Sequence, residues 1–173
     1  MTTIDFSGLK VLLIDDNQHF RVLLRTILMS LGVVDIREAQ DGGDGLAVLA
    51  TFPADLVILD WKMVPMDGVT FAHKVRRGGA TLNSRVPILM LTAFGSDKVI
   101  EEGRAAGVDA FLTKPVSARA LITQLIQVLE EPRSWVEQEN YVGPERRLPN
   151  WQDEALYQGT DRRLPVPLGS VTS

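Results

Sequence analysis

Five short apolar runs, separated by segments with helical periodicity, constrain the fold of this 173-residue chain more than any other feature. The runs span residues 9–14, 33–39, 56–59, 87–91 and 110–112. Each is too short for a typical helix and is rich in Val, Ile and Leu, as strands buried on both faces are. Segments with one apolar helical face lie between them, most clearly over residues 20–31. The alternation predicts an α/β fold, a doubly wound five-stranded parallel sheet with helices on both faces.

Local signals mark the ends of the expected helices. Gly32 stands where a helix C′ residue belongs, and Ser96 and Ser117 are plausible N-caps of the last two helices. Residues 44–50 and 68–76 predict two shorter helices, and residues 118–129 predict a long final one.

Composition excludes several classes of protein. The chain has no cysteine, which excludes disulfides, thiolate zinc sites and a cysteine nucleophile, and its two histidines make a histidine-rich metal site unattractive. Eighteen basic and 22 acidic residues give a formal charge of −4, which argues against a general nucleic-acid binder. Neither a secretion signal nor an apolar stretch of roughly 18 residues is visible. We therefore expect a soluble cytoplasmic protein without a membrane segment.

Polar side chains follow four of the five apolar runs. Asp15 and Asp16 follow the first run and Asp60 follows the third. Thr92-Ala93 follows the fourth run, and Thr113-Lys114-Pro115 follows the fifth. Sites in doubly wound sheets lie at the carboxyl ends of the strands, so we expect these side chains to converge on one rim.

Three carboxylates at one rim need either protons or a divalent cation to offset their charge. Hard oxygen ligands favour Mg²⁺ or Mn²⁺, and a carboxylate beside such an ion can attack a phosphoryl donor and become an acyl phosphate. Each residue also has a purely structural interpretation: an Asp pair after a strand is often a helix N-cap, and a single Asp is often a turn former. Their joint occurrence favours a site.

Four motifs give the chain a family resemblance: VLLIDDN at 11–17, LVILDWKMVPMDG at 56–68, PILMLTA at 87–93 and DAFLTKP at 109–115. On these motifs, residues 9–131 resemble the receiver domain of two-component response regulators, the chemotaxis receiver being the simplest. The resemblance implies the flavodoxin-like strand order 2-1-3-4-5, with a receiver domain over residues 1–131. It also implies phosphorylation of Asp60 by a sensor histidine kinase or a phosphotransfer protein.

The resemblance assigns roles to the other rim residues. The metal ligands would be Asp16, Asp60 and the backbone carbonyl of Lys62, with Asp15 acting mostly through water. The switch and phosphate-binding residues would be Thr92, Ala93, Phe111, Lys114 and Pro115, with a cis bond before the proline.

The chain departs from the family pattern at two places. Val64 stands where receivers usually have proline, and the proline follows as Pro65. Phe111 stands where many relatives have tyrosine. The spacing from Asp60 to Gly68 is kept. The departure at Val64 therefore affects the expected path of the loop after Asp60, and Asp60 remains the expected phosphoacceptor.

Phosphorylation changes the Asp60 monoanion into a group that carries nearly two negative charges and three acceptor oxygens. These should attract Thr92 and Lys114, favour a buried Phe111 and reshape the face made by the fourth helix, fifth strand and fifth helix. Phe94 could also hinder hydrolytic water at the acyl phosphate.

We interpret the chain as a stand-alone response regulator that signals through phosphorylation-dependent protein–protein interaction, with a homodimer as one candidate assembly. The alternatives are a phosphorelay intermediate or phosphate sink without its own output, and a degenerate receiver. An aspartyl-phosphate phosphohydrolase would need a second Asp two residues after the nucleophile, where Lys62 stands. We therefore expect no enzyme activity beyond slow self-phosphorylation and self-dephosphorylation.

Residues 132–173 form a tail that repeats itself at an offset of 16. The shared pattern is W-x5-Y-x-G-x-[DE]-R-R-L-P, which starts at Trp135 and again at Trp151. We expect an extended or disordered tail without a DNA-binding domain, and two recognition elements that dock on the receiver or on a partner. Their contact residues would be Trp135, Tyr141, Arg146, Arg147, Trp151, Tyr157, Arg162 and Arg163. The arginine pairs could instead clamp a cyclic dinucleotide, although acids beside each pair weaken that reading.

Overall fold

A computed structural model describes residues 5–78, 82–93, 97–130 and 134–145 of the chain. Its centre is a five-stranded sheet in the order β2-β1-β3-β4-β5, and every neighbouring pair is parallel. The strands are β1 (Lys10–Ile14), β2 (Asp35–Ala39), β3 (Leu56–Asp60), β4 (Ile88–Thr92) and β5 (Ala110–Thr113). The doubly wound sheet and its strand order are therefore confirmed.

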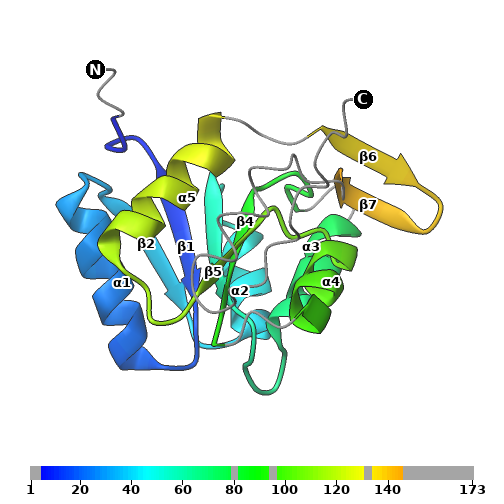
Figure 1. Cartoon of the computed structure of the whole chain (residues 1–173), viewed down its shortest axis with the longest axis horizontal. Coiled ribbons are helices and arrows are strands. Elements are labelled where there is room, and N and C mark those ends of the chain that lie inside the picture. The colour runs from blue at the N-terminus through cyan, green and yellow to red at the C-terminus, as the bar shows by residue number, and fades with distance from the viewer. Residues whose placement is uncertain (1–4, 79–81, 94–96, 131–133, 146–173) are drawn as a thin grey trace, which may run out of the picture.

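Five helices connect and follow the strands. They are α1 (Gln18–Ser30), α2 (Gly42–Leu49), α3 (Gly68–Arg76), α4 (Asp97–Ala105) and α5 (Ala118–Glu130). Helices α1 and α5 cover one face of the sheet, whereas α2, α3 and α4 cover the other (Figure 1). Strands β3 and β4 are buried along their whole length, which explains their unbroken apolar sequence.

The helix ends follow local chemistry. Ser117 Oγ accepts a hydrogen bond from the Ala120 N–H, and Gly32 has a φ of 93° just after α1. Both were expected, whereas Ser96 lies outside the described residues. Asp41 and Asp67 cap α2 and α3. Among the described residues no helix has the length and apolar content to span a bilayer.

The start of the tail differs from the expected extended or disordered segment. Strands β6 (Trp135–Gln138) and β7 (Tyr141–Pro144) form an antiparallel hairpin, with Glu139 and Asn140 in the turn (Figure 1). The physical reason lies in the sequence: Trp-Val and Tyr-Val are strong strand formers, and Asn favours turns. Residues 146–173 lie outside the described part of the chain.

Candidate phosphoacceptor site

Three carboxylates meet at the carboxyl edge of the sheet. Asp15 and Asp16 directly follow β1, and Asp60 is the last residue of β3, the neighbouring strand. One oxygen from each lies within 4.8 Å of the other two. Asp15 and Asp60 are only 1% and 7% exposed, while Asp16 is exposed at the mouth of the cluster. The cluster is therefore open to solvent on the side of Asp16.

Lys114, just after β5, supplies the counter-charge. Its Nζ lies 2.8 Å from Asp15 Oδ2 and 2.8 Å from Asp60 Oδ1. The same Nζ lies 4.1 Å from the centroid of the Phe20 ring, a cation–π contact from the first turns of α1. The ammonium thus sits between the two buried carboxylates.

Burial and charge act in opposite directions at this pair. Burial raises the pKa of Asp60 above its usual value, with help from the charges of Asp15 and Asp16, although Lys114 works against the rise. Burial alone would lower the pKa of Lys114, but its hydrogen bonds to Asp15 and Asp60 outweigh burial and raise it. The lysine therefore stays charged, and the Asp60 carboxylate is held in a setting that disfavours its negative charge.

Two residues to which the sequence assigned no role in the site fix the carboxylates in place. Arg21 is buried on α1, donates from Nη1 to the Asp15 carbonyl at 2.6 Å and pairs from Nε with Glu38 at 3.1 Å. The sequence signal that could have identified Arg21 is a basic residue on the apolar face of a predicted helix. Gly68 is the other: a Cβ there would lie 2.3 Å from the Asp60 carbonyl oxygen. Only glycine lets the start of α3 approach β3 so closely.

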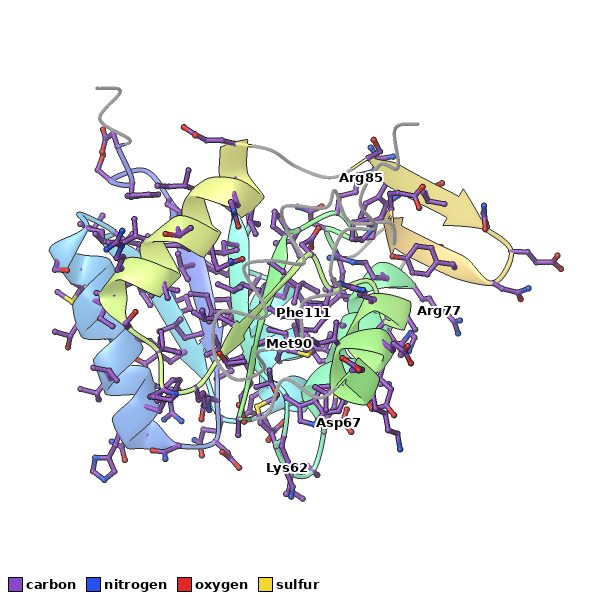
Figure 2. The ribbon with its side chains drawn as sticks, viewed as in Figure 1. Lys62, Asp67, Arg77, Arg85, Met90 and Phe111 are labelled. Atoms are coloured by element: carbon purple, nitrogen blue, oxygen red, sulfur yellow. The ribbon has the colours of Figure 1, made fainter. Side chains whose placement is uncertain are left out.

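The proposed switch residues lie on β4 and β5. Thr92 ends β4 and is 2% exposed, and Ala93 after it is exposed. Phe111 lies inward, next to Met90 of β4 and facing α4 (Figure 2). A Cβ on Gly103 would lie 2.5 Å from the Phe111 ring, so the ring packs directly on the α4 backbone. Phe94 is outside the described residues.

The loop between β3 and α3 carries the departure from the family pattern. Lys62 is exposed and points away from the sheet, whereas Met63 is buried (Figure 2). The Val64–Pro65 bond is cis, and Val64 is 79% exposed. The Lys114–Pro115 bond is also cis, as the resemblance implied.

The donor set fits a small divalent cation. Three carboxylates converge without sulfur or imidazole nitrogen in the cluster, the ligand chemistry that Mg²⁺ and Mn²⁺ prefer. Both Asp15 oxygens accept hydrogen bonds, from Lys114 Nζ and from the Asn17 N–H. Asp15 is therefore already oriented by protein donors, which suits an indirect role, whereas Asp16 is exposed to solvent.

The tail residues lie away from this cluster. Trp135 and Tyr141 belong to the β6–β7 hairpin, which contacts the loops before β4 and β5, at the opposite end of the sheet. Figure 2 shows Arg85 beside the hairpin and Lys62 at the far end of the molecule. The other six expected tail contacts lie outside the described residues: Arg146, Arg147, Trp151, Tyr157, Arg162 and Arg163.

Comparisons with known proteins agree with this geometry. The family model of the response regulator receiver domain matches residues 11–126. The chemotaxis protein CheY-3 of Vibrio cholerae is 31% identical over 123 residues, covering 71% of this chain and 93% of its own length. The chemotaxis protein CheY of Pseudomonas aeruginosa is 30% identical, covering 70% and 97%. The solved structure of CheY4 from Vibrio cholerae has a TM-score of 0.65 and 33% identity, covering 70% and 98%.

Proposed function

Because the chain belongs to the response regulator receiver family, we propose that it is a stand-alone regulator that accepts a phosphoryl group on Asp60 from a histidine kinase or a phosphotransfer protein. One observation carries this proposal: the Asp60 carboxylate lies at a solvent-open carboxylate cluster, with the Lys114 ammonium 2.8 Å away. A nucleophile, a cation site and a fixed positive charge thus occupy one place. The chain acts as a signalling protein in this proposal, with no enzyme activity beyond slow self-phosphorylation and self-dephosphorylation.

The transfer is a displacement at phosphorus. An Asp60 oxygen forms a bond to phosphorus while the bond from phosphorus to the donor's imidazole nitrogen breaks. The electron pair of that bond stays on the imidazole, which takes a proton from water. Desolvation keeps the Asp60 carboxylate poorly stabilised as an anion, which favours its reaction.

Each neighbouring residue has a defined part. Asp16 and Asp60, with the Lys62 carbonyl, would hold Mg²⁺ or Mn²⁺, and Asp15 would act mostly through water. The bound cation supplies neutralisation of negative charge on the transferring group. Lys114 exchanges its contact with Asp60 for a phosphoryl oxygen and keeps its contact with Asp15.

The output follows from the same contacts. Once Asp60 carries phosphate, Thr92 and Lys114 are drawn to the new oxygens from the ends of β4 and β5. Because the Phe111 ring packs on the α4 backbone, a shift of these strand ends changes how α4 and α5 present their shared face. A downstream protein that reads this face receives the signal, and no DNA-binding domain is seen in the described part of the chain.

The test is labelling by acetyl phosphate with Mg²⁺ present. D60N should abolish incorporation of phosphate, because an amide cannot form the acyl phosphate. The matched control is D55N: Asp55 accepts a hydrogen bond from the Lys10 N–H at the other end of β1 and should not affect labelling. Undiminished labelling of D60N would overturn the proposal. Capture of a partner only in the presence of beryllofluoride, a phosphoryl mimic, would identify the output.

A further inference from the structure

The β6–β7 hairpin docks on the receiver through one aromatic side chain, Trp135, that contacts two arginines. The Trp135 ring lies 5.3 Å from the guanidinium carbon of Arg76 and 5.3 Å from that of Arg85. Glu137 reinforces the contact, because its Oε1 accepts from Trp135 Nε1 at 2.8 Å and lies 3.5 Å from Arg85. Trp135 is therefore held by two cation–π contacts and by a hydrogen bond from its indole N–H to a carboxylate.

The receiver builds this docking surface from its own residues. Arg76, at the end of α3, donates from Nε to the Gly107 carbonyl and from Nη1 to the Ser84 and Val86 carbonyls. Its Nη2 pairs with Asp109 at 2.8 Å. None of these four partners belongs to the tail. The guanidinium plane is fixed before any ring stacks on it, so the surface is a preformed site for an aromatic side chain.

Contacts within the hairpin stabilise its own conformation. The Tyr141 hydroxyl donates to the Pro144 carbonyl, and the Glu145 N–H donates to the Ser134 carbonyl at 2.7 Å. Gly143 allows the closest approach to the receiver: a Cβ there would lie 3.0 Å from the Gly107 Cα and 2.7 Å from the Tyr141 hydroxyl. Tryptophan, acid, tyrosine and glycine are thus the four side-chain requirements of docking.

The second copy of the tail repeat has all four at the same spacing: Trp151, Asp153, Tyr157 and Gly159. Pro144 is replaced by Thr160, which still offers the backbone carbonyl that the tyrosine hydroxyl needs. At the positions of the turn residues Glu139-Asn140 the second copy has Ala155-Leu156, which are weaker turn formers. The second copy therefore carries the residues that dock the first copy, with a sequence that is less favourable for a hairpin turn.

We propose that the surface made by Arg76, Arg85 and Gly107 is a recognition site for which the chain carries two ligands, residues 135–144 and residues 151–160. The second ligand docks on the same molecule when the first leaves. This inference goes beyond the proposed function and does not depend on phosphorylation of Asp60.

The lengths of chain set the order of preference. The first tryptophan lies five residues after the end of α5 and the second lies 21 residues after it. Effective concentration falls roughly as the 3/2 power of linker length, so the first copy is favoured about ninefold from tethering alone. The first hairpin can therefore be given up to a partner protein while the second keeps the site covered.

The experiment uses the full chain and the side-chain N–H of Arg76 as the reporter. This N–H is buried and donates to the Gly107 carbonyl at 2.8 Å, so its proton exchanges slowly and gives a separate NMR signal. A ring stacked on the guanidinium shifts that signal upfield. Four chains are compared: wild type, W135A, W151A and W135A/W151A.

We expect W151A to leave the shift unchanged, W135A to retain most of it, and the double variant to lose it. W135A/G159V should also lose it, because the added side chain would collide where Gly143 approaches Gly107 in the first copy. Backbone amide signals of the sheet serve as the check on folding. The proposal is overturned if W135A alone loses the whole shift, or if the shift retained in W135A disappears on dilution, which would place the second ligand on another molecule.

Discussion

Replacement of Arg76 by alanine should be among the most costly single substitutions at the end of α3. The Arg76 side chain is 1% exposed, and its partner Asp109 is 16% exposed. Removing one member of a buried ion pair costs about 3–5 kcal/mol, because the other member is left without its counter-charge. The carbonyls of Ser84, Val86 and Gly107 lose their donor at the same time. We therefore expect the free energy of unfolding to fall by about 3–5 kcal/mol, a large part of the roughly 5–15 kcal/mol typical of a domain.

Arg85 provides the matched control. It touches the same Trp135 ring at the same distance of 5.3 Å, but its side chain is 66% exposed and its ion pair with Glu137 spans 3.5 Å. Exposed pairs contribute about 0–1 kcal/mol, so R85A should cost no more than that. R76K should recover little of the loss, since one ammonium cannot replace a planar fork that reaches four acceptors.

The assay is urea unfolding of the full chain, followed by far-ultraviolet circular dichroism. The midpoint for R76A should fall while the slope stays near that of wild type, because both states keep their compactness. A cost for R76A that is as small as the cost for R85A would refute the reasoning that the buried hydrogen bonds of Arg76, and not its stacking on Trp135, carry its contribution.

Further predictions concern the carboxylate cluster. Because burial raises the pKa of Asp60, the folded chain binds a proton on this carboxyl group more tightly than the unfolded chain does. D60N should therefore be more stable than wild type at neutral pH, and the difference in stability should shrink as the pH falls toward the ordinary carboxyl pKa of 3.8. Unfolding experiments at several pH values measure this difference. K114M should tighten Mg²⁺ binding at least tenfold, about 1.4 kcal/mol, since it removes a positive charge beside the cation. Quenching of the fluorescence of the neighbouring Trp61 would measure the binding. Weaker Mg²⁺ binding by K114M would contradict the expected competition between the ammonium and the cation. G68A should slow labelling by acetyl phosphate roughly tenfold because its Cβ displaces the Asp60 backbone, which raises the activation barrier by about 1.4 kcal/mol. G8A, with no atom within 4 Å of its Cβ, should leave the rate unchanged.

The sheet and the rim were accessible from the sequence because both depend on short-range patterns. Unbroken apolar runs such as those of β3 and β4 indicate strands that are buried on both faces. The polar residues that follow such strands must lie at the carboxyl edge of a parallel sheet. Ser117 and Gly32 marked helix ends for similarly local reasons.

The residues that were missed depend on contacts that are distant in the sequence. Arg76 looks like an ordinary basic residue in the last turn of a helix, where the helix dipole favours it. Its partners lie eight to 33 residues further along the chain, and no periodicity connects them. The hairpin was missed for a different reason: the prolines of the tail suggested disorder, although Trp135-Val136 and Tyr141-Val142 are typical strand dipeptides.

The hairpin and the carboxylate cluster lie at opposite ends of β4 and β5. Strands of four or five residues separate them by about 15 Å, more than the reach of any side chain. A protein that holds the arginine end therefore leaves the aspartate end accessible, and one molecule has room for a phosphate donor and a tail-reading partner in the same encounter. Simultaneous occupancy of the two ends would let this chain bridge two other proteins, so its abundance relative to each of them would decide how many such bridges form.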